Sequence, residues 1–335
     1  MSIKKQTVII LFGIGVLILI FIGIRLYFKT PPLIATLRGH QGGICHIAFS
    51  PDNNWVASCG KDMIIRIWNL HTKNPEIILQ GHSDKVVGLA FSQDLIASAS
   101  WDGTVKLWDL RTAKVIETII SGTQLSNNKG SQPVVAVAFS PDGKLLAFGG
   151  GGGTLNLWNL STKTLQQVPQ QTSKYIMSLV FSSDGLLASR TYDGIITIWD
   201  TENLKQLNRL GEKSSGFGFY RMAFSPGGEF LVYNDILRNL IIWNMARREE
   251  TRIIKTDLKW PINSIVFFPN GKIIATGVII DETLRIWDSE IGKLLSTFRI
   301  GNNYGIAISQ DGKTLGSIHQ DGSIKLWDIS KLLDP

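Results

Sequence analysis

The chain has 335 residues, of which 44% are hydrophobic, and it contains 33 Gly and 10 Trp, a composition that excludes a disordered protein. The formal net charge is +7, but residues 1–30 supply +4 of it, so the other 305 residues carry only +3 and no basic block of the kind that nucleic-acid binding requires. Two cysteines exclude a scaffold built on disulfide bonds.

The N-terminal segment predicts a membrane anchor. A short basic tail (residues 1–6) precedes the uncharged run TVIILFGIGVLILIFIGI (7–24), whose helix would be about 27 Å long, close to the thickness of a bilayer's hydrocarbon core. Arg25 and Lys29 follow and can reach the headgroups. A cleaved signal peptide would have a shorter apolar region and small residues at its cleavage site, and a buried core helix would need a covering partner. We therefore expect residues 7–24 to contact the lipid bilayer as a single-pass helix, with residues 25–32 as a linker.

From residue 33 onward the chain repeats one unit seven times. Trp followed by Asp or Asn recurs at intervals of 40, 50, 41, 44, 44 and 40 residues. A second motif keeps step with it, in the forms IAFSPDN, LAFSQD, VAFSPDG, LVFSSDG, MAFSPGG, IVFFPNG and IAISQDG. Such a period is the signature of a repeat architecture, and it decides the fold before any other feature.

Each unit predicts four short strands. VVAVAFS (134–140) is an apolar, β-branched run that is too short for a helix, and the PDGK that follows it suits a turn. LLAFG (145–149) predicts a second strand, and VKLWDL (105–110) alternates apolar and polar residues as a half-buried strand does. A fourth apolar segment such as VIETII (115–120) completes the unit. One such sheet cannot cover its own faces, but seven packed radially cover each other.

The period, the GH pair before a repeat and the WD pair that ends the third strand together resemble the WD-repeat (WD40) family. The resemblance implies an all-β fold, a seven-bladed β-propeller over residues 33–330, with a short tail at 331–335. The last unit has only three strands, whereas LIATLRGH (33–40) resembles PEIILQGH (75–82), a fourth strand followed by GH. We therefore expect residues 33–38 to pair with the last blade, which closes the ring as in the family and removes an exposed sheet edge.

The resemblance also implies a buried hydrogen-bonded network of Asp, His, Ser or Thr, and Trp in each blade. The first two units match it fully and three later units match it in part. The matching residues are His40, Ser58, Asp62 and Trp68; His82, Ser98, Asp102 and Trp108; Ser189, Asp193 and Trp199; Thr276, Asp281 and Trp287; and Ser317, Asp321 and Trp327. In the third unit GGGGG (149–153) stands where Ser and Asp would sit, and in the fifth YNDILRN (233–239) is similarly degenerate. Because a partial network is a liability, we expect the third and fifth blades to be softer.

No catalytic, metal or cofactor site is indicated. GGGGG lacks the Gly-Lys-Ser/Thr ending of a phosphate-binding loop and suits a turn. The five histidines show no metal-ligand spacing, and no G-x-S-x-G nucleophile motif is present. Cys45 and Cys59 are predicted on neighbouring strands but on opposite faces of the sheet, which disfavours a disulfide and suits two buried, small apolar residues.

The remaining signal is a surface. In the family, the loops between blades and the turns between second and third strands form one rim that commonly binds partners. Exposed aromatic residues interleaved with Lys suit such a protein-binding face, although several could simply pack against neighbouring loops. The candidates are Lys61, Lys85, Trp101, Tyr175, Tyr192, Tyr220, Trp260 and Tyr304, with Gln320 at a matching turn. The polar insertion at 121–133 is expected on the same rim.

These observations favour a non-catalytic, membrane-anchored scaffold that binds a protein or peptide, with no nucleic acid expected. The alternative is an enzyme or ligand-sensing propeller that uses the central channel, because fold alone excludes neither. The basic tail before the apolar run resembles a signal anchor and favours a propeller outside the cytoplasm, whereas the mostly intracellular habit of the family argues against this.

Overall fold

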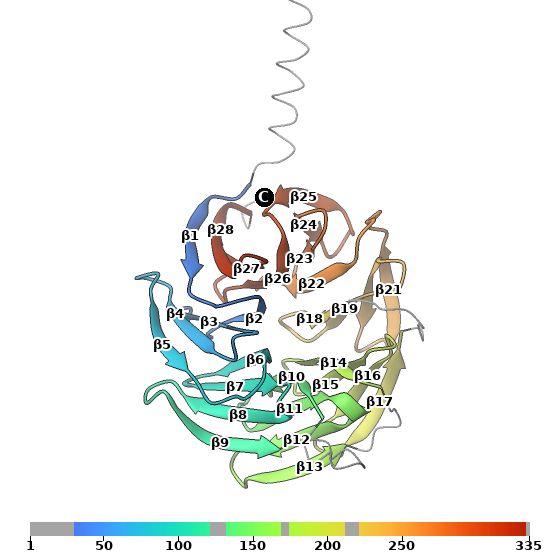
Figure 1. Cartoon of the computed structure of the whole chain (residues 1–335). Coiled ribbons are helices and arrows are strands. Elements are labelled where there is room, and N and C mark those ends of the chain that lie inside the picture. Colours follow the sequence, from blue (N-terminus) through green and yellow to red (C-terminus); the bar gives the residue numbers. More distant parts are fainter. Residues whose placement is uncertain (1–29, 121–131, 169–173, 212–220, 333–335) are drawn as a thin grey trace, which may run out of the picture.

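The structure, a computed structural model, describes residues 30–120, 132–168, 174–211 and 221–332. These residues form seven four-stranded antiparallel sheets arranged as blades around a central axis (Figure 1). The seven-bladed β-propeller predicted from the repeats is thereby confirmed. The predicted membrane helix at 7–24 lies outside the described residues. Within the described ranges, no helix has the length and apolar character needed to cross a membrane.

Each blade runs from an inner strand beside the axis to an outer strand at the rim of the disc (Figure 1). From inside to outside, the blades are β2 (Ile44–Phe49), β3 (Trp55–Gly60), β4 (Ile65–Asn69) and β5 (Pro75–Leu79); β6 (Val86–Ser92), β7 (Leu95–Ser100), β8 (Thr104–Asp109) and β9 (Lys114–Ile120); β10 (Val134–Phe139), β11 (Leu145–Gly150), β12 (Leu155–Asn159) and β13 (Thr164–Val168); β14 (Ile176–Phe181), β15 (Leu187–Thr191), β16 (Ile196–Asp200) and β17 (Lys205–Leu210); β18 (Met222–Phe224), β19 (Phe230–Asn234), β20 (Leu240–Asn244) and β21 (Glu249–Ile254); β22 (Ile262–Phe267), β23 (Ile273–Val278), β24 (Thr283–Asp288) and β25 (Leu294–Arg299); and β26 (Asn303–Ile308), β27 (Thr314–His319), β28 (Ser323–Asp328) and β1 (Leu33–Arg38).

The seventh blade takes its outer strand from the other end of the chain. β1 pairs antiparallel with β28, with Leu37 opposite Ile324, and the sheet order is β1-β28-β27-β26. The backbone N–H of Asp328 also donates to the carbonyl of Pro32 at 2.8 Å. Without β1, the backbone groups of β28 that face outward would lose their partners and form an open sheet edge.

The core is divided among the interfaces between blades. The described residues contain seven buried hydrophobic clusters, and each cluster joins two neighbouring blades. Between the first and second blades, for example, fully buried Ile65 and Ile67 of β4 pack with Val86 of β6 and Trp108 of β8. This pattern follows from the sequence, because each sheet has two apolar faces and a single blade can bury neither alone.

The register of the first blade places His46 opposite Cys59, with Cys45 at an irregularity between two pairs. Both thiols are free. Cys59 is fully buried, whereas Cys45 is only half-buried, so the expectation that both are buried is wrong for Cys45. The bulge explains the difference, because it takes Cys45 out of the alternation of the strand.

The glycine run of the third blade forms a tight turn. Gly151–Gly153 make one 3₁₀ turn between β11 and β12. A Cβ atom at Gly150 would overlap the carbonyl oxygen of Pro133, so the chain approaches itself too closely there for any other residue. The glycine run was expected to occupy both the Ser and the Asp positions of the network, and this is correct only for Asp. Gly152 stands at the Asp position, whereas Phe148, opposite Val137, stands at the Ser position.

Candidate functional site

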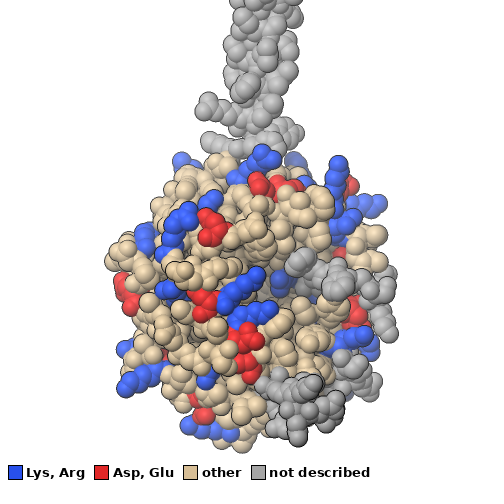
Figure 2. Space-filling model, viewed as in Figure 1, with Lys and Arg blue, Asp and Glu red and all other residues tan. Residues whose placement is uncertain are grey.

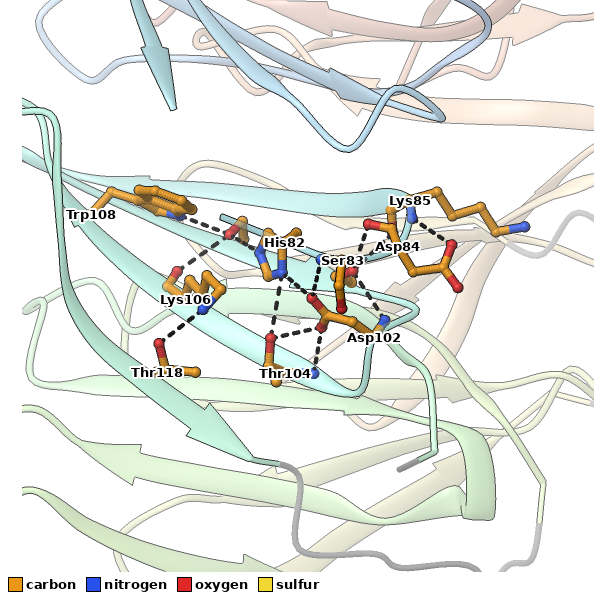
Figure 3. Close-up of polar contacts among 11 residues, drawn as sticks. His82, Ser83, Asp84, Lys85, Asp102, Thr104, Lys106, Trp108 and Thr118 are labelled. Carbon is orange, nitrogen blue, oxygen red and sulfur yellow. Dashed lines mark hydrogen bonds and ion pairs between the residues drawn. The ribbon is translucent and has the colours of Figure 1, made fainter. Parts of the chain in front are cut away.

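A continuous hydrogen-bonded network crosses the second blade (Figure 3). Trp108 Nε1 donates to Ser98 Oγ at 2.8 Å, Ser98 Oγ lies 2.7 Å from His82 Nε2, and His82 Nδ1 lies 2.7 Å from an Asp102 carboxylate oxygen. Burial acts to raise the pKa of Asp102, but the hydrogen bonds from His82 and Thr104 outweigh it and lower that pKa. The network ties β7 and β8 to the loop between β5 and β6 through buried polar groups that are all satisfied.

The first blade repeats this arrangement. Trp68 Nε1 donates to Ser58 Oγ at 2.9 Å, His40 Nε2 lies 2.8 Å from the same oxygen, and His40 Nδ1 lies 2.9 Å from Asp62. Burial is the largest influence on the pKa of His40 and lowers it. The Gln41 backbone N–H donates to the same carboxylate, so the network also fixes the loop between β1 and β2.

The fourth and sixth blades keep only the hydrogen bond from the tryptophan to the Ser or Thr hydroxyl. Trp199 donates to Ser189, and Trp287 donates to Thr276, both at 2.9 Å. The described loops before these blades contain no histidine, so the Asp in each turn is bonded to side chains of its own blade. Asp193 accepts from Thr191 at 2.6 Å. Asp281 accepts from Thr283 at 2.6 Å and from Arg285 at 3.5 Å.

In the seventh blade a histidine from a different position joins the Trp–Ser part of the network. Trp327 donates to Ser317 at 2.8 Å, and His319 Nε2 lies 2.8 Å from the same Ser317 oxygen. Burial, followed by the charge of Lys325, lowers the pKa of His319 to about 4. No sequence motif marks His319, because it is on β27 two residues after Ser317 and not in the loop before the blade. Asp321 instead accepts from Ser323 and from Arg38 of the closing strand.

The third and fifth blades lack the network, as their sequences indicated. Trp158 is half-buried, and Trp243 Nε1 is buried without a hydrogen-bond partner among the described residues. Tyr233 stands at the Ser position of the fifth blade, and its hydroxyl donates to Glu250 at 3.2 Å. The softness expected of these two blades stays a prediction.

The predicted rim carries exposed aromatic side chains. Trp101, Tyr175, Trp260 and Tyr304 have exposed fractions between 41% and 43%. The Lys85 ammonium nitrogen lies 3.1 Å from the centre of the Trp101 ring, a cation–π contact at a position open to solvent. Figure 2 shows Lys and Arg side chains gathered around the centre of the face in view, with acidic side chains beside them.

Other rim candidates differ in exposure. Lys61 and Gln320 are exposed, and Tyr220 lies outside the described residues. Tyr192 is half-buried, so the expectation that it is exposed is wrong. In the same turn, Thr191 Oγ1 lies 2.6 Å from the Asp193 carboxylate and 3.1 Å from Ile195 O.

Two arginines link the fourth blade to the fifth and the fifth to the sixth. Arg221 lies directly before β18, and its Nε donates to the carbonyl of Asn263 at 2.7 Å. Buried Arg190 of β15 donates to the carbonyl of Arg221 at 2.6 Å. Burial, followed by the charge of Arg221, lowers the pKa of His46 on β2 to about 4. No sequence motif marks these residues, and they belong to blades that are separate in the chain.

Comparison with known proteins agrees with the fold. The family model "WD domain, G-beta repeat" matches residues 31–69, 73–109, 250–288 and 292–328. The model "Anaphase-promoting complex subunit 4 WD40 domain" matches residues 92–184.

Within the described ranges, no group of three or more His, Cys, Asp or Glu side chains is placed to hold a metal ion.

Several curated proteins are similar at low identity. THO complex subunit 3 of Arabidopsis thaliana is 25% identical over 71% of this chain and 74% of its own length. Nuclear distribution protein PAC1 of Arthroderma otae is 25% identical over 91% of this chain, and autophagy-related protein 16 of Arabidopsis thaliana is 24% identical over 67%. The chain spans only 63% and 43% of these last two proteins. With seven four-stranded blades, two complete Asp-His-Ser-Trp networks and the matched repeats, the chain belongs to the WD40-repeat family of β-propellers.

Proposed function

We propose that this chain is a non-catalytic scaffold, anchored in a membrane by residues 7–24, whose propeller binds a protein or peptide on its aromatic rim. WD40 propellers bind proteins, and the similar curated proteins belong to named assemblies or processes and carry no enzyme names. The observation that carries the proposal is the set of four aromatic side chains left exposed on one rim. Large aromatic side chains dominate the energetics of protein interfaces, and exposing them costs free energy unless a partner covers them.

Paired substitutions test the rim. Trp101→Ala combined with Tyr304→Ala removes two exposed rings from separate blades, and Ile116→Ala, at an exposed position on the outer strand β9, is the matched control. Proteins recovered with the full-length chain from detergent-solubilised membranes are compared quantitatively among the wild type, the double variant and the control. We expect the control to retain its partners and the double variant to lose them, with melting temperatures within a few degrees of each other. Equal recovery by the wild type, the double variant and the control would show that these rim side chains do not bind the partner.

The membrane component is supported by the uncharged 18-residue run alone. We propose that it is a retained single-pass anchor and that the propeller lies outside the cytoplasm. Alkaline extraction of membranes should leave the full chain in the pellet, and protease added to intact cells or spheroplasts should digest the propeller. Full protection from protease would contradict the proposed topology, and release by alkali would contradict the proposed membrane anchor.

A further inference from the structure

Six blades share one backbone hydrogen bond at the end of their strands that lies opposite the aromatic rim. In each, the residue after the Trp-Asp or Trp-Asn pair donates its N–H to the carbonyl of the residue that precedes the second strand. The donors are Leu70, Leu110, Leu160, Met245, Ser289 and Ile329. Because this bond fixes the backbone, the six side chains hold equivalent places in their blades.

In five of these blades the side chain at this place is aliphatic. Each of the five packs into the apolar cluster that joins its blade to the preceding one. The exception is half-buried Ser289 of the sixth blade, whose Oγ donates to the carbonyl of Gly271 in its own blade at 3.0 Å. The interface between the neighbouring fifth and sixth blades (Figure 1) therefore lacks an aliphatic side chain that five other interfaces have.

The fourth blade shows how such a loss can be offset. There the residue after the Trp-Asp pair is Thr201, and Leu204, four residues after Asp200, packs against the apolar cluster between the third and fourth blades. In the sixth blade the residue four positions after Asp288 is Gly292, and both positions have a positive φ, 53° at Leu204 and 74° at Gly292. The sixth blade thus has neither of the two side chains that fill this space elsewhere.

Ser289 lines a hollow of about 590 Å³ between the fifth and sixth blades. Its apolar lining includes buried Ile242 and half-buried Phe230 and Phe267, which belong to the apolar cluster of this interface. The volume lies within the range of about 300–1,000 Å³ that is common for ligand pockets. Since the equivalent place is filled by Leu, Met or Ile in five other blades, an aliphatic side chain is the group that fits here.

Exposed charged side chains surround this apolar lining. They are Arg247, Arg252 and Lys272, against Glu229 and Glu290. Arg247 lies 3.8 Å from Glu249, whereas Arg252 and Lys272 have no carboxylate within 4.0 Å in the described part of the chain. An excess of one cation around the hollow favours an occupant that carries an acid beside its apolar group.

We propose that this hollow binds a partner protein through a segment that inserts one aliphatic side chain, the size of leucine, against Phe230, Ile242 and Phe267. An acidic residue next to it lies near Arg252 and Lys272. The inserted side chain takes the place that five other blades fill from their own sequence. This second protein-binding site goes beyond the proposed function and lies at the opposite end of the strands from the rim, so either surface can fail without the other.

The test measures the binding of short peptides to the full-length chain in phospholipid nanodiscs, with empty nanodiscs as the blank. The probe is a fluorescently labelled Gly-Glu-Leu-Glu-Gly peptide, followed by fluorescence anisotropy. Gly-Glu-Ala-Glu-Gly removes the aliphatic side chain from the probe, and Gly-Lys-Leu-Lys-Gly reverses its charge. An affinity is taken from each titration.

Two substitutions in the protein have matched controls in the third blade. Ser289→Leu supplies the missing side chain from the chain itself, and Ser161→Leu places the same residue at an exposed position of the corresponding turn. Lys272→Gln removes one unpaired charge, and Lys144→Gln removes a charge from the equivalent place, since its carbonyl accepts from Leu160 as that of Lys272 does from Ser289.

We expect the leucine peptide to bind the wild type and both controls equally. The alanine peptide should bind about tenfold or more weakly, because it buries less apolar surface. Ser289→Leu should abolish binding, and Lys272→Gln should weaken it about two- to fivefold, as expected for an exposed charge pair. The Trp101→Ala, Tyr304→Ala variant should bind the peptide like the wild type.

Three results would overturn the proposal: no saturable binding of the leucine peptide below about 1 mM, equal affinities for the leucine and alanine peptides, or undiminished binding by Ser289→Leu. Binding lost in the Trp101→Ala, Tyr304→Ala variant instead would place the peptide on the rim and also overturn it. Equal affinity for the lysine peptide would contradict the acidic part. If Ser289→Leu does not fold, the comparison of leucine with alanine peptide and the response of Lys272→Gln decide in its place.

Discussion

The blade network allows a sharp comparison between two serines. Ser98 and Ser189 are both fully buried, and each accepts from a tryptophan, at 2.8 and 2.9 Å respectively. Each also lies at hydrogen-bond distance from one backbone carbonyl. The difference is His82, whose Nε2 lies 2.7 Å from Ser98 and has no counterpart at Ser189. Ser98→Ala and Ser189→Ala therefore remove the same atom from surroundings that differ by one buried partner.

The magnitude follows from what each substitution leaves unpaired. Ser189→Ala strands one indole N–H, and a buried polar group without a partner costs roughly 1–3 kcal/mol. Ser98→Ala strands both the Trp108 indole and the His82 ring nitrogen, so the cost is about 2–6 kcal/mol by the same rule. The expected difference is therefore about 1–3 kcal/mol, with the second blade affected more than the fourth.

Urea unfolding followed by tryptophan fluorescence measures both costs, and hydrogen exchange of the amides in β7, β8, β15 and β16 shows whether the loss stays within each blade. Equal costs, within about 0.5 kcal/mol, would refute the reasoning, because the histidine would then add nothing to the network. A larger cost for Ser189→Ala would refute it more strongly.

Three further outcomes are expected. Removing residues 1–38 should open the last blade and cause aggregation, whereas removing residues 1–30 should leave a soluble ring; equal solubility would contradict closure by β1. The pKa of His46 in the folded chain, about 4, lies below its ordinary value of 6.5, so the unfolded chain binds the proton more readily. Stability present above pH 6.5 should fall by about 3 kcal/mol as the pH drops toward 4, and a His46→Gln chain with the same slope would disprove this. Gly150→Ala should destabilise the third blade, since its Cβ overlaps Pro133 O, and unchanged thermal unfolding would show that the turn relaxes at no cost.

Much of the propeller could be predicted from the sequence because its signals are local and repeated. The alternation of apolar and polar residues, the PDG and DG turns and the WD pairs each act within a few residues, and seven copies reinforce one another. Even the pairing of β1 with β28 could be read from the resemblance between LIATLRGH and PEIILQGH, two segments that play one role.

The polar details depended on contacts that no local pattern encodes. His319 reaches Ser317 because alternate side chains of β27 share one face, a substitute for the loop histidine of other blades. Tyr192 is half-buried, although the same position in the second blade leaves Trp101 exposed. The sequence spacing predicts the same exposure for both positions, but the side chains that surround them differ.

The sequence by itself determined the number of blades, the order of strands and how the ring closes, since these follow from hydrophobic period and turn chemistry repeated along the chain. Only the tertiary structure decided which side chains influence one another across blades. His46 lies on β2 and Arg221 directly before β18, and each alone reads as an ordinary polar residue at a strand. The charge of Arg221 lowers the pKa of His46 because ring closure, not any local signal, arranges their two blades around one axis.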